Sequence, residues 1–549
     1  ACGKTQACIQ KIREVQSHQP MSKIWVLVPD SQNIAYFRRR LANAGGGMGV
    51  HVGTFSALFT EILEKHRIFT PVISPALEHR LVQETVDRAF EEGALQHYAA
   101  IKRKPGFIQA LGDVFSELRS GYVQPEQFLE YTHDSVPSKR DLAGVYRRFI
   151  DRLNTLNWID RDGQIWQAIS LLQNDPDAAA AIRLVVLSGF SSFAGARQHF
   201  LKTLSEQVGE MIITLPGKRQ SNRAVHQGTT DEIEKLVKVF SPEIVELTTP
   251  PRLFPESMQI EKHVLDPGEH QKIQASRPLF LEVHSQSEEA REALRWIKKL
   301  HQREGYPLDA CAVFVGDLPA YRPLLQSAAA EFGIKIHFSH PDALIGSPAI
   351  QSILTLLQLP LDDFQTRAIL IALQSPFFDF GLDGGEIEDL KRVSQHTHIV
   401  MGRAQWEEAW ETLSQPAPDD DAGLIDERQF KDPLEGMDIC SLRDRFSEFW
   451  ALFPTTNETR SQNDWITWLE KTLEGLNFYD RITDERDQET CAAIGKAFRA
   501  LILSEQVAGS RKVDYAGFLS DLQGTLRGAR LEEPRAARRN ALYIGKMTE

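Results

Sequence analysis

The first residues of the chain have the types and the spacing that bind phosphate. Gly3, Lys4 and Thr5 stand directly before a helix-like stretch that begins at Gln6. Glycine lets backbone N–H groups approach a phosphate, lysine places a positive charge beside the β- and γ-phosphate oxygens, and threonine can ligate Mg²⁺. The complete motif has another glycine five positions earlier and a strand before it, neither of which this sequence contains. We therefore predict a partial phosphate-binding loop at Gly3, Lys4, Thr5 and Gln6.

The residues after this loop alternate between helix and strand patterns. The apolar run at 24–29 is typical of a buried strand, and the segment 50–58 passes from a strand into a helix. Between them lies an arginine-rich helix that contains Arg38, Arg39 and Arg40. We interpret this run as a solvated helix face, as runs of charge usually are. Residues 1–70 therefore indicate an α/β core.

The following hundred residues contain only helical periodicity. Apolar side chains recur at helical spacing between residues 71 and 181, and no strand pattern interrupts them. Two β-branched runs then follow at 184–190 and 211–216, joined by a helix that carries Arg197. This order predicts a βαβ unit, whose crossover is right-handed by default. We interpret residues 217–275, which are polar and contain prolines, as the exit from the first core.

The second half of the chain repeats this plan. Strand and helix patterns alternate at 279–283, 287–304, 310–315, 321–332 and 334–338. That order favours a parallel sheet. Residues 346–529 are again helical, apart from an acidic loop at 416–422 that we expect to be solvated. A last strand pattern at 542–545 suggests that the second core closes there.

Composition excludes several classes of protein. A chain of 549 residues is too long for one hydrophobic core. No apolar run approaches the ~20 residues that span a bilayer, and no secretory signal is visible, so we expect a cytoplasmic protein without membrane contact. The net charge of −13 argues against a uniformly basic nucleic-acid binder but allows a locally basic channel.

The cysteines and histidines give no pattern for a metal site. The five cysteines form no CxxC pair, and the histidines are isolated, so we expect free thiols and no bound metal. Cys2 and Cys8 are interpreted as small buried apolar residues rather than ligands. The first residue is not methionine and a strand pattern stands at the last residues, which suggests truncation at both ends.

Taken in order, these stretches resemble a known family. The plan resembles that of superfamily 1 DNA helicases, and its details are most similar to the AddB/RexB-type subunit of bacterial double-strand-break repair helicase–nucleases, a group similar to RecC and RecB. The matching stretches are Gly3–Thr5, Trp25–Pro29, Val52–Ser56, Leu187–Phe190 with Phe193 and Gln198, Glu282–Phe338, Gly346–Pro348 and Gln374–Phe378. The resemblance implies an α/β fold with two RecA-like P-loop cores, each with a parallel sheet interrupted by a large all-helical insertion.

The same resemblance divides the chain into segments. The first RecA-like core comprises 1–70 and 182–275, its helical insertion 71–181, the second and incomplete core 276–345 and 530–549, and the second insertion 346–529.

Two features depart from an active helicase–nuclease. Active helicases of this superfamily have an Asp-Glu pair at the end of the strand that matches 184–187, where the carboxylates hold Mg²⁺ and position the attacking water. Ser188 and Gly189 occupy that position here. The family's nuclease follows the second core, beyond the last residue of this sequence, and its iron–sulfur cluster needs four thiolates. We therefore assign no catalytic residue, expect no iron–sulfur cluster, and name ATP with Mg²⁺ as the cofactor that the partial loop could hold.

The resemblance also implies contacts with single-stranded DNA. At Thr54 and Phe55, a hydroxyl would meet a phosphate and a ring would stack on a base. The alternative places Phe55 in the core and Thr54 at the start of the next helix as its cap. Phe193, Arg197 and Gln198 follow a strand at the edge where open parallel sheets bind ligands, and we predict DNA contacts for them as well.

Three other assignments complete the site prediction. Phe190 is assigned to the core. Arg322 begins a helix of the second core, where it would meet a phosphate of DNA or nucleotide; the alternative is a surface ion pair that contributes little. We interpret Ser375–Phe378 as architecture, because it combines a helix terminator with two apolar anchors.

Our hypothesis is a helicase-like, ATPase-degenerate DNA-binding subunit of a double-strand-break resection complex. It would guide or scan single-stranded DNA, or DNA that is being unwound, while a helicase–nuclease partner of the AddA/RexA type supplies the motor. Two alternatives remain: an active ATP-dependent superfamily 1 helicase whose acidic residue comes from elsewhere in the chain, and a non-enzymatic scaffold for assembly of the complex.

Overall fold

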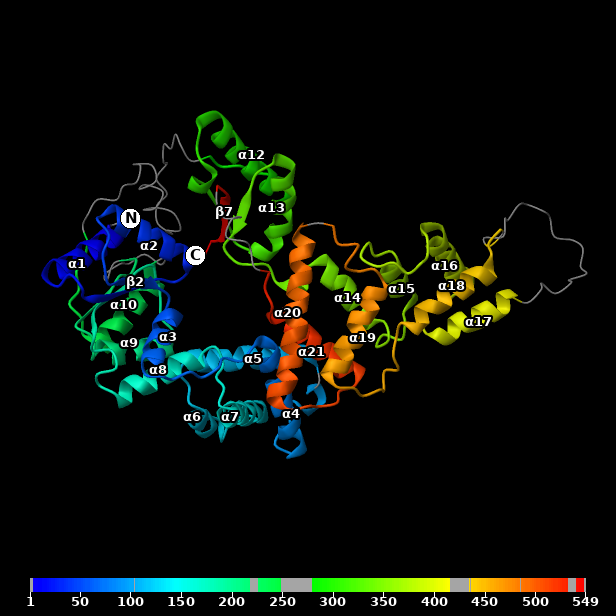
Figure 1. Ribbon diagram of the computed structural model, residues 1–549, viewed down its shortest axis with the longest axis horizontal. Coiled ribbons are helices and arrows are strands. Elements are labelled where there is room, and N and C mark those ends of the chain that lie inside the picture. Colours follow the sequence, from blue (N-terminus) through cyan, green and yellow to red (C-terminus); the bar gives the residue numbers. More distant parts are fainter. Residues whose placement is uncertain are drawn as a thin grey trace, which may run out of the picture. The chain divides into compact units, whose positions relative to one another are not determined.

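The computed structural model describes residues 3–102, 104–217, 226–247, 279–414, 434, 436–483, 485–531 and 540–547 (Figure 1). The chain forms two compact units, which comprise residues 1–73, 85–100 and 110–280, and residues 74–84, 101–109 and 281–549. The acidic loop predicted at 416–422 lies outside the described residues. No helix within the described ranges is long and apolar enough to cross a membrane.

A four-stranded parallel sheet forms the centre of the first unit. Its strands are β1 (Lys23–Leu27), β2 (Val50–Gly53), β3 (Ile182–Leu187) and β4 (Glu210–Ile213). They lie in the order β2-β1-β3-β4, and β1 pairs with both β2 and β3. The strands predicted from the apolar runs at 24–29, 184–190 and 211–216 are thus confirmed, as is their parallel arrangement.

Helices cover both faces of this sheet because side chains alternate along each strand. Ile24 and Val26 of β1 pack with the helices α1 (Lys4–His18) and α2 (Ser31–Asn43) on one face. Trp25 and Leu27 face the opposite layer. That layer contains α3 (Phe55–Lys65), α8 (Gly163–Asn174), α9 (Gly195–Ser205) and α10 (Gln227–Phe240). Helix α10 lies in the segment interpreted above only as a polar exit.

The segment between β2 and β3 is helical, as its periodicity predicts. Its elements are α3, α4 (Pro75–Glu91), η1 (Ala99–Ile101), α5 (Pro105–Ser120), α6 (Pro125–Thr132), α7 (Pro137–Leu156) and α8. A buried ion pair joins two of its parts: Arg119 Nε and Nη2 donate to Asp160 Oδ2 and Oδ1 at 3.0 and 2.8 Å. The guanidinium also lies 4.2 Å from the centroid of the Trp166 ring.

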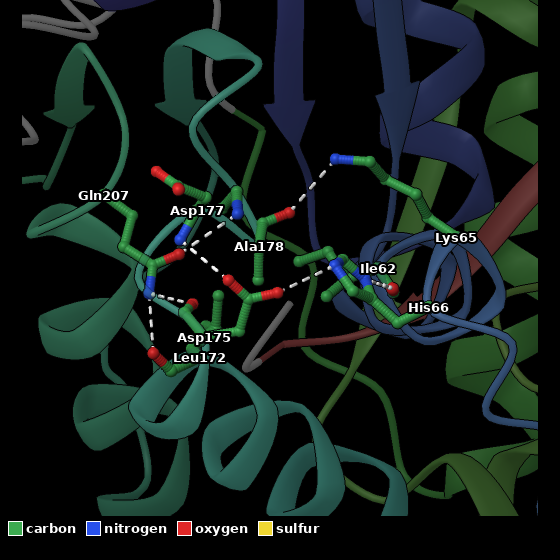
Figure 2. A network of polar contacts seen from close by, with 9 residues as sticks. Ile62, Lys65, His66, Leu172, Asp175, Asp177, Ala178 and Gln207 are labelled. Carbon is green, nitrogen blue, oxygen red and sulfur yellow. Dashed lines mark hydrogen bonds and ion pairs between the residues drawn. The ribbon is translucent and has the colours of Figure 1, made fainter.

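Polar contacts fasten this segment to the sheet at the start of β3 (Figure 2). Gln207, in the connection from α9 to β4, donates from Nε2 to the carbonyl oxygens of Leu172 and Asp175 at 2.6 and 3.0 Å. Its Oε1 accepts from the backbone N–H of Ala179 at 3.0 Å. His66, at the end of α3, lies with Nε2 3.3 Å from Asp175 Oδ2. The ends of α3 and α8 are therefore tied to the edge of the sheet where β3 begins.

The second unit has a smaller parallel sheet with the order β5-β7-β6. Its strands are β5 (Ala312–Val315), β6 (Ile336–Phe338) and β7 (Leu542–Lys546). Helices α12 (Gln286–Glu304) and α13 (Leu318–Phe332) pack on this sheet, and the turn η3 (Leu308–Ala310) precedes β5. The strand predicted near the end of the sequence is confirmed, and it lies in the middle of the sheet between strands more than 200 residues earlier.

The strand predicted at Leu279–Val283 was wrong. These residues form no strand, and Leu279 and Phe280 expose 60% and 87% of their surface. The apolar run suggested a buried strand, but an apolar run becomes a strand only where a neighbouring strand offers backbone partners. The described residues provide none at this place.

The rest of the second unit is helical. It contains η4 (Leu344–Gly346), α14 (Pro348–Gln358), α15 (Thr366–Leu373), α16 (Gly384–His396), α17 (Arg403–Ser414), α18 (Ile439–Ala451), α19 (Gln462–Gly475), α20 (Glu485–Ala508) and α21 (Tyr515–Gly528). Large buried rings such as Trp406 and Trp465 fill its core. Phe378 is buried just after α15 ends, which agrees with the architectural interpretation of Ser375–Phe378. The assignment of both sheets to RecA-like cores stays a prediction.

Candidate nucleic-acid interface

The carboxyl ends of the parallel strands in the first unit lie along one edge of the sheet. β1 connects to β2 through α2 on one face, whereas β3 connects to β4 through α9 on the opposite face. The direction of winding therefore reverses between the neighbours β1 and β3, and open α/β sheets bind ligands at such a reversal. We call this edge, with the residues that follow the strands, the switch-point edge.

The backbone at this edge disfavours a side chain at Gly189. Gly189 follows β3 with a φ of 92°, and a Cβ added to it would lie 3.2 Å from Cδ of Pro29. Asp30 follows β1, but its carboxylate caps α2: it accepts from the backbone N–H groups of Gln32 and Asn33 at 2.8 and 2.9 Å. Ser188 and Gly189 thus follow β3 at this edge, and neither supplies a carboxylate.

The first turn of α1 lies toward the same edge. A connection of four residues joins the end of α1 to β1, so the helix runs back along the sheet and begins near the carboxyl ends of the strands. Gly3 precedes it with a φ of 80°, a left-handed conformation that favours glycine. Lys4 and Thr5 are half-buried in the first turn. The amide oxygen of Gln6 accepts a hydrogen bond from Arg40 Nη2 at 3.2 Å, which commits this side chain to α2.

Thr54 and Phe55 follow β2 and have different environments. Thr54 is the N-cap residue of α3, but its hydroxyl makes no capping hydrogen bond. Phe55 exposes 6% of its surface, and its ring lies 5.4 and 6.4 Å from the rings of Phe190 and Phe193, measured between centroids. Phe55 therefore belongs to the core in this structure, and stacking on a base would require its ring to leave this cluster.

The loop from β3 to α9 is fixed by hydrogen bonds to the backbone of Phe193. The N–H of Phe193 donates to Glu232 Oε1 at 3.0 Å. Gln198 Nε2 donates to the carbonyl oxygen of Phe193 at 3.1 Å and to the same Glu232 oxygen at 3.2 Å. The ring of Phe193 is buried, whereas Ser191 and Ser192 are exposed. Phe193 and Gln198 thus shape the loop, and its serines face solvent.

Glu232 is a site residue that the sequence reasoning missed. It lies on α10, exposes only 3% of its surface, and has Lys235 Nζ at 3.8 Å from Oε2. The helical spacing of Ile233, Leu236 and Phe240 could have predicted α10. No local signal, however, places Glu232 beside a loop almost 40 residues earlier.

Arg197, near the start of α9, is exposed. Its guanidinium carbon lies 5.4 Å from the centroid of the Phe55 ring. No carboxylate lies within ion-pair distance of this guanidinium in the part of the chain that the structure describes. Arg197 therefore presents a positive charge at the switch-point edge.

Arg322 has a different setting, in the second unit. It exposes only 8% of its surface, and its Nη2 donates to the carbonyl oxygen of His340 at 2.6 Å. Its Nε lies 3.7 Å from Asp342 Oδ1, and its guanidinium stacks 4.0 Å from the Phe338 centroid. The ion pair proposed as the alternative is present, but its arginine is buried and its aspartate is half-buried. A DNA contact of Arg322 stays a prediction.

The described thiols and carboxylates do not assemble into a metal site. No group of three or more His, Cys, Asp or Glu side chains could hold an ion within the described ranges. Cys8 exposes 1% of its surface, and burial raises the pKa of its thiol to about 11, so the thiol is protonated at neutral pH. Cys2 lies outside the described residues.

Comparison with known proteins connects the chain to a described family. Residues 1–264 match the family model described as ADDB, N-terminal. A protein of Carboxydothermus hydrogenoformans, described as the B subunit of an ATP-dependent helicase/deoxyribonuclease, is 22% identical over 547 residues, 95% of this chain and 45% of the relative. A protein of the same description from Thermoanaerobacter sp. is 22% identical over 492 residues, 83% of this chain and 41% of the relative.

Residues 1–264 thus belong to the AddB N-terminal family, and the chain is similar to AddB-type subunits over most of its length. A third relative with that description, from Alkaliphilus metalliredigens, is 21% identical over 71% of this chain and 35% of its own length. The chain thus spans less than half the length of these curated relatives. The AddB N-terminal match includes β1 to β4, α1 to α3, α9 and α10, which are the elements that position the switch-point edge.

Proposed function

We propose that this AddB-type chain is a DNA-guiding subunit of a bacterial helicase–nuclease complex that acts in double-strand-break repair. It holds single-stranded DNA at the switch-point edge of its first sheet and does not hydrolyse ATP. The descriptions of the relatives support membership of such a complex. The motor and the helicase–nuclease partner of the AddA/RexA type would be other parts of that complex.

The observation that carries this proposal is the chemistry exposed at the switch-point edge. Arg197 offers an unneutralised charge, Ser191 and Ser192 are exposed, and the Thr54 hydroxyl is not used as a cap. Arginine and hydroxyl side chains are common phosphate contacts in DNA complexes, where they set the position and path of the strand. The two nearby carboxylates, Asp30 and Glu232, accept internal hydrogen bonds. The phosphates of a DNA strand at this edge would therefore meet hydrogen-bond donors rather than free carboxylates.

ATP with Mg²⁺ fits this site only in part. The N-terminus of α1, with Gly3, Lys4 and Thr5, suits the phosphate end of a nucleotide. Hydrolysis also needs carboxylates that orient Mg²⁺ and water, and the position that would supply them holds Ser188 and Gly189. We therefore infer that nucleotide binding, if retained, is uncoupled from turnover.

The experiment that tests this function measures DNA binding and ATP hydrolysis on the same purified 549-residue protein. We expect a single-stranded oligonucleotide to bind at low salt and to stimulate no phosphate release from ATP. Lys4→Ala should leave the DNA affinity unchanged. Phosphate release that rises with DNA and disappears in Lys4→Ala would instead establish an active helicase. The observation that favours this alternative is the phosphate-binding sequence in the first turn of α1.

The scaffold alternative predicts a third result. Stable binding of a partner subunit without affinity for any oligonucleotide would favour it and would exclude the DNA-guiding role.

A further inference from the structure

Two adjacent helices of the first unit carry a concentration of arginines outside the switch-point edge. Residues 4–49 contain seven lysines and arginines but only two carboxylates, in a protein whose net charge is −13. The four arginines among these seven residues lie on α1 and α2, the blue helices of Figure 1. We call them the α1–α2 basic surface, which comprises Arg13, Arg38, Arg39 and Arg40.

Hydrogen bonds of Arg40 and Arg38 fix the position of α2 in this surface between α1 and β2. Arg40 donates from Nη2 to Gln6 of α1 at 3.2 Å and from Nη1 to the Tyr36 hydroxyl at 2.9 Å. Arg38 Nη2 donates to the carbonyl oxygen of Val52 in β2 at 2.9 Å. Successive residues of a helix project about 100° apart, so Arg39 points between its two neighbours, and it is exposed.

Arg13 extends this surface from α1. Its side chain is exposed and reaches the loop that follows α2, where a Cβ on Gly45 would lie 3.9 Å from Arg13 Nη2. The basic surface thus runs from the β2 side of α2 to the part of α1 that lies beside the loop after α2.

These arginines differ from others on the molecule in their lack of carboxylate partners. Arg147 contacts Glu126 and Asp151, and Arg148 contacts Glu92, all within 3 Å. By contrast, none of the four arginines of the basic surface has a carboxylate within ion-pair distance among the described residues. Unpaired positive charge is costly to concentrate, because like charges repel each other. Such a concentration suits a polyanionic partner.

We propose that the α1–α2 basic surface binds the phosphate backbone of duplex DNA. Duplex binding that is independent of sequence requires only cationic and polar contacts with phosphates. Single-strand binding also uses aromatic faces on which bases stack. The exposed ring of this surface, Tyr36, is held by Arg40, whose guanidinium lies 5.8 Å from the ring centroid. The surface therefore offers mainly positive charge, and its exposed ring already contacts a guanidinium.

This inference rests on the proposed function for its partner, DNA, and adds a second place of contact. The switch-point edge would guide a single strand, while the α1–α2 basic surface would bind the duplex before its strands separate.

The test compares two double variants of the full chain in equilibrium binding to a blunt duplex and to a single strand of the same length. Arg13→Gln with Arg39→Gln removes two exposed charges that make no hydrogen bond in the described structure. We expect duplex affinity at low salt to fall by about tenfold or more, and the salt slope of duplex binding to decrease by about 2. Single-strand affinity should change little.

The matched control is Arg147→Gln with Arg161→Gln, which makes the same change in net charge elsewhere in the first unit. It should leave duplex binding near that of the wild type. An equal loss in both double variants, an unchanged duplex affinity, or a loss confined to the single strand would each overturn the proposal. Because single-strand binding is measured in parallel, failure of this surface is distinguishable from failure of the DNA-guiding function, which would show as absence of single-strand binding by the wild type.

Discussion

At the scale of single residues, Glu232 illustrates how one buried carboxylate can shape a site. Its replacement by alanine would leave the N–H of Phe193 and the amide of Gln198 without their shared acceptor. An unsatisfied buried donor costs about 1–3 kcal/mol, so Glu232→Ala should lower the free energy of unfolding by roughly that amount. Glu232→Gln retains an acceptor oxygen and should lose less. Chemical denaturation measures both, and equal stability of Glu232→Ala and the wild type would contradict the role given to this contact.

Residue types alone could not settle the environments of the aromatic and arginine side chains. Phe55 and Phe193 were predicted to contact DNA, yet both rings pack in the core, because the start of α3 and the loop before α9 meet on the same face of the sheet. Arg322 is buried by contacts with Phe338 and His340. A phenylalanine or an arginine can serve a core or a ligand equally well. Only the packing of distant segments decides which.

At the scale of elements, the contacts of Gln207 hold α8 and the connection between α9 and β4 together. Gln207→Ala would remove the partners of two carbonyl oxygens and one N–H at the edge of the sheet where β3 begins. We expect a loss of about 1–3 kcal/mol in the free energy of unfolding. Single-strand affinity should not change, because the switch-point edge is at the other end of the strands.

Gln10→Ala provides a matched control, because Gln10 is exposed on α1. It should alter neither stability nor binding. A Gln207→Ala protein with wild-type stability would show that this network does not fasten the helical segment.

Most elements could be predicted because their local pattern and their environment agree. The run Leu184–Leu187 is apolar and β-branched, and it lies in the interior of a sheet covered on both faces. The similar run at Leu279–Val283 lacks strand partners among the described residues, which no local pattern reveals. Helix α10 was not predicted, because the polar and proline-containing residues around it hid the helical spacing of its apolar side chains.

At the scale of the whole molecule, the order of elements carried more information than any motif. The three residues Gly3–Thr5 are common in proteins, whereas an α/β core that contains a helical segment, followed by a second sheet closed by residues 542–546, is far more specific. That order supported the resemblance that the AddB N-terminal match then confirmed. The arrangement of polar groups at the switch-point edge depends on tertiary contacts and came only from the structure.

The proposed function requires the switch-point edge to hold a DNA strand through phosphate contacts. Its sharpest test is the single-strand affinity of the wild type and of Arg197→Gln across a series of salt concentrations, with Arg147→Gln as a control of equal charge. We expect wild-type binding to weaken steadily as salt rises. The slope of log affinity against log salt concentration should be smaller in magnitude by roughly one in Arg197→Gln but not in the control. Absence of wild-type binding at low salt, or identical slopes for the wild type and Arg197→Gln, would contradict this role of the edge.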